Sequence, residues 1–158
     1  IGERVWDISR GIDALETFGG LDLNHIVCLG NSGGGTAAYY AAAMDERIFL
    51  AVPSCSVSSY RDSIGAIHHC PCNYLPGALK WFDMGEIACL IAPRKLLVAA
   101  GKKDEIFPID GVRKVYSVIE SVYKKENAEE NVRLIETEKD HWFCDDLIWP
   151  AVNKIIKG

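Results

Sequence analysis

The segment Gly30–Gly34 places a serine between glycines with the spacing G-x-S-x-G. An apolar run, 26–29, precedes it, and small residues and alanines follow it as far as Met44. This pattern predicts a strand, a sharp turn carrying Ser32 and a helix, the arrangement that exposes a serine hydroxyl as a nucleophile. The Gly33 N–H would lie at the helix N-terminus, where it can bind an oxyanion. The alternative is a glycine-rich loop without chemistry. We expect a side chain at either flanking glycine to clash with neighbouring backbone.

Two later segments could supply the acid and the base that such a serine needs. Asp104 follows the apolar run 96–100, and His141 follows the run 132–136. Because ligand sites in open parallel sheets lie beyond the carboxyl ends of the strands, we expect both residues to lie near Ser32. There His141 would take the proton of the attacking hydroxyl, and Asp104 would orient the imidazole and stabilise its charged form.

Other acidic residues and other histidines could take the roles given to Asp104 and His141. Glu105 and Asp110 compete for the role of the acid, although Asp110 is better explained as the N-cap of the following helix. His25 precedes a strand, which puts it at the wrong end of the sheet. His68 and His69 precede the last two strands, so their chain order is wrong. The order serine, aspartate, histidine, each after a strand, favours the catalytic interpretation over three unrelated turn residues.

The elements that must position these residues alternate between helix and strand. A helical spacing of apolar residues predicts a first helix over 3–18, ended by glycines, and a terminal helix carries Leu147 to Ile155. We expect an α/β fold with a mostly parallel sheet of about four strands flanked by helices. Residues 56–86 are irregular and are interpreted as a loop-rich insertion over the strand ends, within a single partial domain, 1–158. The predicted strands are 26–29, 48–52, 96–100 and 132–136, the last of them polar enough for an edge.

Composition excludes several classes of function. The 158 residues carry a net charge of −5 with no basic run, which argues against nucleic acid as a partner. No apolar stretch approaches the ~18 residues of a membrane span. The sequence starts at Ile1 without a methionine or a signal-like segment, so a processed or trimmed product is consistent with it.

The six cysteines indicate a reducing compartment. Cys28, Cys55 and Cys89 lie in apolar runs that are interpreted as core, so we expect them to be free thiols, and we expect the protein in the cytoplasm. Cys70 and Cys72 are separated by a proline, so a bridge between them would be strained.

The run His68-His69-Cys70-Pro71-Cys72 raises the alternative of a metal site. Histidine and cysteine are zinc ligands, but this run lacks the paired, separated spacing of a structural zinc site. We therefore expect no metal and no cofactor. The interpretation that we favour is a loop lining a substrate cleft, with Cys70, Cys72 and Trp142 as candidate substrate-binding residues. The other large aromatic residues, Trp81, Phe82 and Trp149, are expected to be packing residues.

The chain resembles α/β-hydrolases of the acetyl xylan esterase-like, dienelactone hydrolase-related group. This resemblance implies that Ser32 is the nucleophile, Asp104 the acid and His141 the base in the hydrolysis of a small ester or an acetylated carbohydrate. One departure is Asp140, where such enzymes often have glycine, and this carboxylate could compete with Asp104 for the histidine. The resembling segments cover nearly the whole chain: Trp6-Asp7-Ile8, Ile12-Asp13, Gly30 to Thr36, Asp45 to Ile48, Cys70 to Tyr74, Phe82-Asp83-Met84, Ile91 to Arg94, Leu96-Leu97, Gly101 to Asp104, Phe107-Pro108 and His141.

The same resemblance implies about eight strands, with the serine strand near the middle of the sheet. This sequence supplies four, so strand 26–29 would lie at a bare edge, without the loop that gives the second oxyanion N–H. The chain is then expected to be the C-terminal portion of a larger hydrolase, or a truncated relative that forms homo-oligomers through this edge. The alternative function is a weakly active or inactive domain that acts as an oligomerising or interaction module.

Overall fold

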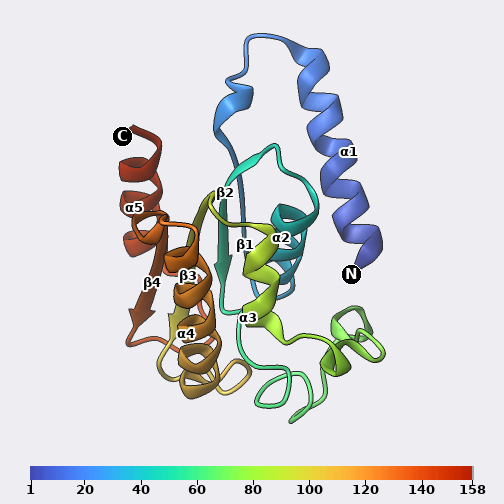
Figure 1. Cartoon of the computed structure of the whole chain (residues 1–158), viewed down its shortest axis with the longest axis vertical. Coiled ribbons are helices and arrows are strands. Elements are labelled where there is room, and N and C mark those ends of the chain that lie inside the picture. The colour runs from blue at the N-terminus through green and yellow to red at the C-terminus, as the bar shows by residue number, and fades with distance from the viewer. Residues whose placement is uncertain (158) are drawn as a thin grey trace.

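A computed structural model describes residues 1–157 of the chain. Its centre is a parallel sheet of four strands in the order β1-β2-β3-β4, as Figure 1 shows. The predicted α/β class and the parallel sheet are confirmed, and each strand extends beyond the apolar run that predicted it. The strands are β1 (Ile26–Asn31), β2 (Ile48–Ser54), β3 (Lys95–Gly101) and β4 (Val132–Thr137).

Helices cover the two faces of the sheet unequally. On one face, buried side chains of α1, α2, α3 and α4 pack against Ile48, Leu96 and Val98. On the other face, α5 packs against Leu50, Val52 and Leu97, while Val27 and Leu29 of β1 stay half-buried. This alternation along β2 and β3 explains why both strands are continuously apolar. The helices are α1 (Gly2–Phe18), α2 (Gly33–Met44), α3 (Met84–Ile87), α4 (Ile109–Lys125) and α5 (Asp145–Lys157).

The segment between β2 and α3 passes the carboxyl ends of the strands, below the sheet in Figure 1. It contains turns and two short 3₁₀ helices, Pro71–Asn73 and Ala78–Lys80. None of the helices in residues 1–157 has the length and apolar character needed to cross a membrane.

Several local expectations from the sequence are wrong. Asp110 is not an N-cap, because α4 begins at Ile109 with Pro108 as its cap; Asp110 lies in the first turn, where a negative charge suits the helix dipole. Cys89 is exposed rather than part of the core, whereas Cys144 is buried. The aromatic residues expected to pack are largely exposed: Trp81, Phe82 and Trp149.

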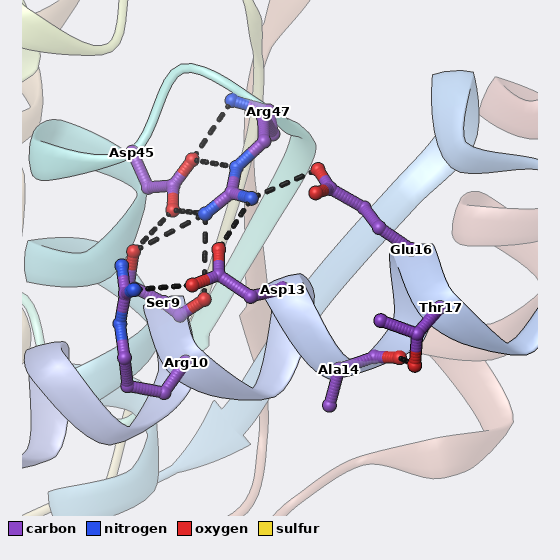
Figure 2. A network of polar contacts seen from close by, with 8 residues as sticks. All are labelled: Ser9, Arg10, Asp13, Ala14, Glu16, Thr17, Asp45 and Arg47. Carbon is purple, nitrogen blue, oxygen red and sulfur yellow. Dashed lines mark hydrogen bonds and ion pairs between the residues drawn. The ribbon is translucent and has the colours of Figure 1, made fainter.

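A polar network centred on Arg47 fastens α1 to the rest of the domain (Figure 2). The Arg47 guanidinium donates to both carboxylate oxygens of Asp45, at 2.9 and 2.6 Å, and to Asp13 at 2.7 Å and Glu16 at 2.9 Å on α1. The Ser9 hydroxyl also donates to Asp45, at 2.6 Å. Hydrogen bonds from Arg47 hold the pKa of the Asp45 carboxyl well below its ordinary value. Asp45 therefore stays charged in the fold at neutral and mildly acidic pH.

Asp45→Asn should lower the free energy of unfolding by about 1–3 kcal/mol at neutral pH, because a buried, charge-assisted set of hydrogen bonds is weakened. Glu16→Gln, at a half-exposed partner of the same guanidinium, should cost less than about 1 kcal/mol. Urea unfolding measures both values.

The difference between wild type and Asp45→Asn should also depend on pH. Since the folded-state pKa of Asp45 is depressed, its contribution is complete above the unfolded-state value of about 3.9 and is lost as the pH falls toward the folded-state value. The stability gap should be constant from pH 8 to about 5 and shrink below about pH 4. A gap that widened in acid would contradict this account.

Candidate active site

One residue of interest follows each of the four strands at the carboxyl edge of the sheet. Ser32 follows β1, Cys55 follows β2, Asp104 comes shortly after β3, and His141 lies in the loop after β4. The first two are tied to neighbouring strand ends: the Ser32 N–H donates to Ser54 O and the Cys55 N–H to Ala99 O, each at 2.8 Å. The sheet thus gathers residues that are far apart in the sequence.

Ser32 has the strained backbone that the serine motif predicts. Its φ of 55° and ψ of −123° place a non-glycine residue in a region that L-residues rarely adopt. Helix α2 begins at the next residue, and the Ser32 carbonyl accepts a hydrogen bond from the Thr36 N–H at 2.9 Å. Because Ser32 stands at the junction of β1 and α2, its side chain is attached to the tip of a sharp strand–helix turn.

The glycines whose lack of a side chain permits the turn at Ser32 are only partly the ones that the sequence predicts. A Cβ on Gly30 would lie 2.4 Å from the carbonyl carbon of Gly34, and a Cβ on Gly35 would lie 2.8 Å from Gly30 O. A Cβ on Gly34 would have no neighbour within 4 Å. The expectation that both flanking glycines avoid a clash is therefore right for Gly30 and wrong for Gly34. The close approach of β1 and α2 depends on the pair Gly30 and Gly35.

Asp104 and His141 form a direct pair. The His141 Nδ1 lies 2.8 Å from Asp104 Oδ2. Asp104 is 4% exposed, and its other oxygen accepts the N–H groups of Ile106 at 2.8 Å and Phe107 at 3.0 Å. These two main-chain donors fix the carboxylate in the orientation that faces the imidazole. With Nδ1 engaged by Asp104, the other ring nitrogen is the one left to act as a base.

Asp140 does not compete for the histidine in the described contacts. Its main chain instead packs against the end of β3, where a Cβ on Gly101 would lie 2.1 Å from Asp140 O. The Lys103 N–H donates to Lys139 O at 3.0 Å and holds the same loop. A glycine at this strand end therefore lets the loop approach closely enough for His141 to reach Asp104.

The hydrogen bond expected between Ser32 and His141 is not among the contacts of the described residues. Strand order places Ser32 at β1 and the histidine loop at β4, with β2 and β3 between them. Catalytic hydrogen bonds are often long without substrate and tighten when it binds. The structure brings Asp104 and His141 together and places Ser32 at the same edge of the sheet.

Cys55 is a residue of this site that the sequence analysis assigned to the core. Its Sγ, a carboxylate oxygen of Asp104 and a ring nitrogen of His141 all lie within 4.8 Å of one another. The thiol also lies 3.6 Å from the carbonyl oxygen of Trp142. Burial raises the pKa of Cys55 to about 11, so this thiol is neutral. The signal that could have revealed it is its position directly after β2, which matches that of Ser32 after β1.

A cleft of about 590 Å³ opens beside the histidine. Phe107 stacks on the His141 ring with centroids 5.9 Å apart, and the edge of His69 meets Phe107 at 5.5 Å. Trp142, 64% exposed, is one of the residues that line the cleft, and Cys70 and Cys72 are not among them. The lining residues are Lys103, Glu105, Ile106, Asp140, His141 and Trp142.

The run His68 to Cys72 is not among the groups of converging potential metal ligands in residues 1–157. Among the residues that the structure describes, the one group of three potential ligands with converging atoms is Cys55, Asp104 and His141. Two of these, Asp104 and His141, already bond each other.

Solved structures with the same arrangement of elements identify the fold. A carbohydrate esterase family 15 glucuronoyl esterase from Caldicellulosiruptor kristjansonii superposes with a TM-score of 0.79 at 20% identity, over 94% of this chain and 47% of that one. The chain has the α/β-hydrolase fold. A glucuronoyl esterase from Sporotrichum thermophile gives a TM-score of 0.75 at 22% identity, over 98% and 51% of the two chains.

Other comparisons agree with this fold. The methylesterase BT1017 superposes with a TM-score of 0.73 at 23% identity, over 91% of this chain and 32% of that one. In sequence, the chain is 29% identical over 144 residues to the "Putative hydrolase YtaP" of Bacillus subtilis (strain 168), covering 89% of this chain. The match covers 48% of that protein, so the chain spans about half the length of its curated relative. No protein-family model matches the chain.

The glycines at the serine turn of this α/β-hydrolase fold give a matched pair of variants. Gly30→Ala should destabilise the fold by several kcal/mol or prevent folding, because its Cβ would meet the Gly34 main chain. Gly34→Ala should leave the stability within about 1 kcal/mol of wild type, because its Cβ enters open space and alanine favours the helix. Thermal unfolding followed by circular dichroism measures both. Equal losses in the two variants would contradict the described turn.

Proposed function

We propose that the chain carries the catalytic residues of a serine esterase: Ser32 as nucleophile, His141 as base and Asp104 as acid. The observation that carries this proposal is the 2.8 Å pair between His141 and the buried Asp104, at the sheet edge where Ser32 adopts a strained turn. Two main-chain N–H groups also hold the Asp104 carboxylate in the orientation that faces His141. This order supports a catalytic pair over a chance meeting of turn residues.

The proposed reaction proceeds through an acyl-enzyme. The His141 nitrogen that does not face Asp104 takes the hydroxyl proton as Ser32 Oγ attacks the carbonyl carbon of the ester. The bond to the alcohol oxygen breaks, and the alcohol leaves with that proton. Water then attacks the acyl carbon on Ser32 with His141 again as base, the bond to Ser32 Oγ breaks, the carboxylic acid leaves, and His141 returns the proton to Ser32. Asp104 holds the ring tautomer and stabilises the imidazolium.

The Gly33 N–H is the oxyanion donor that this part of the chain supplies. It is the first residue of α2, directly after the nucleophile, where both the N–H and the helix dipole favour negative charge. Complete α/β-hydrolases take a second donor from a loop after an earlier strand. A site with a single donor should be slower by ~10²–10³ in kcat.

The expected substrate is a small ester or an acetylated carbohydrate. The structural relatives are described as glucuronoyl esterases and a methylesterase, and one of them was solved with methyl 4-O-methyl-beta-D-glucopyranuronate, a sugar ester. The exposed Trp142 at the cleft suits stacking on a sugar ring, and Lys103 in the same lining could bind sugar hydroxyls or a carboxylate.

The bare edge of β1 favours a second candidate function, that of a pairing module. β1 has β2 on one side and no strand on the other within residues 1–157, and all six of its residues are half-buried. An open, flat strand edge pairs readily with another strand. We propose that this edge pairs with a second copy of the chain or with further strands of a longer protein.

The first test of the esterase is hydrolysis of p-nitrophenyl acetate. We expect a slow but measurable rate in this chain. Ser32→Ala should abolish the rate. Ser121→Ala, on the exposed face of α4, is the matched control and should leave it unchanged. Hydrolysis that survives in Ser32→Ala would exclude the proposed nucleophile.

A dilution series tests whether pairing at the β1 edge completes the site. If a second copy contributes the missing donor, activity per chain should fall as the protein is diluted, and sedimentation should show a dimer at the higher concentrations. Excess Ser32→Ala chain should then restore the activity of dilute wild type, because it can pair without reacting. A strictly monomeric chain with concentration-independent activity would refute the pairing.

A further inference from the structure

Cys70 and Cys72 bring two thiols together outside the catalytic site. Their Sγ atoms lie 2.9 Å apart, with the Cys72 thiol donating to Cys70. Cys70 is exposed and Cys72 is half-buried, so reagents in solution can reach the pair. The other four cysteines have no such neighbour among the described contacts. Two adjacent, accessible thiols can react as a unit in ways that isolated thiols cannot.

A tight turn holds the two thiols on one side of the loop. Cys70 is the N-cap of the 3₁₀ helix Pro71–Asn73, and the Asn73 N–H donates to Cys70 O at 2.9 Å. The His69 N–H donates to the Tyr74 hydroxyl at 3.0 Å, which fastens the entry of the turn to its exit. Pro71 restricts the backbone between the cysteines. The two thiols are therefore positioned by the turn rather than meeting by chance.

We propose that Cys70 and Cys72 are a reversible dithiol–disulfide site, oxidised by low-molecular-weight disulfides such as oxidised glutathione. The proposal rests on the distance between the sulfur atoms, their access to solvent and the turn that holds them.

The pKa values of the two thiols are shifted in opposite directions, so one thiol can attack and the other can resolve. The hydrogen bond from the Cys72 thiol lowers the pKa of Cys70. The same hydrogen bond raises the pKa of Cys72, so of the two residues Cys70 is the one that favours the thiolate. Since the thiolate is the nucleophile, Cys70 is the attacking residue and Cys72 the resolving one.

The reaction is a two-electron exchange in two steps. The Cys70 thiolate attacks one sulfur of oxidised glutathione, the S–S bond breaks, and one glutathione leaves as a thiolate that takes up a proton. The Cys72 thiol loses its proton and attacks the Cys70 sulfur, and the second glutathione leaves and is protonated. In sum, two protein thiols are oxidised to one disulfide and one glutathione disulfide is reduced to two thiols.

The sequence predicts that a disulfide between Cys70 and Cys72 is strained, and this strain would make the bond easy to reduce. A bridge across a single proline closes a small ring, and strained, exposed disulfides are more oxidising and more easily reduced than structural ones. The bond should therefore form with a high ratio of oxidised to reduced glutathione and reopen when the ratio is lowered.

Intact-mass spectrometry of the whole chain after exposure to oxidised glutathione tests the proposal. Wild type should lose the mass of two hydrogen atoms and retain four of its six thiols, and peptide mapping should place the bond between Cys70 and Cys72. Dithiothreitol should restore all six. A wild-type chain that keeps six thiols, carries glutathione on both residues or bridges a different pair would overturn the proposal.

Serine variants separate the pair from single exposed thiols. Cys72→Ser should stop at the first step and carry one glutathione on Cys70, because no resolving thiol is left. Cys89→Ser removes an exposed cysteine elsewhere and should form the Cys70–Cys72 bond as wild type does. A bond that formed in Cys72→Ser, or failed to form in Cys89→Ser, would contradict the assignment. The wild-type masses decide the proposal even if one variant folds poorly.

Discussion

The site depends on close main-chain contact at the carboxyl edge of the sheet. Gly30 lets α2 begin directly against β1, which forces Ser32 into its strained turn. Gly101 lets the loop after β4 pack against the end of β3, which brings His141 to Asp104. A side chain at either glycine would separate main-chain segments that now touch. The placement of three distant segments thus depends on glycines, Gly30 with Gly35 at the serine turn and Gly101 at the end of β3.

The buried carboxylate of Asp104 is held in place by hydrogen bonds. Asp104 is almost fully buried, yet its oxygens accept two N–H groups and face one imidazole nitrogen. A buried charge costs free energy unless such partners compensate it. Here the two main-chain N–H groups and His141 together compensate that cost. Cys55 packs beside them as a neutral thiol and contacts the main chain at Trp142.

Much of this arrangement could be predicted from the sequence because it depends on local patterns. Apolar runs of four or five residues predicted the first three strands, a more polar run predicted the fourth, and the glycine–serine spacing predicted the turn at Ser32. The role of Gly34 was wrong because the clash depends on how α2 leaves the turn, which spacing alone does not define. Cys55 was missed because a buried cysteine after an apolar strand is indistinguishable in sequence from a core residue. Trp81 and Cys89 were expected inside because they lie in apolar or aromatic runs, but exposure depends on which elements cover them.

The most direct measurement of the central claim is labelling of the chain with a fluorophosphonate, which reacts far faster with an activated serine than with an ordinary one. The account predicts one adduct per chain, mapped to Ser32, lost in Ser32→Ala and strongly slowed in Asp104→Asn, in which the histidine loses its charged partner. No labelling of the folded wild type, or an adduct on another serine, would contradict the proposal that these residues form the active site of a serine esterase.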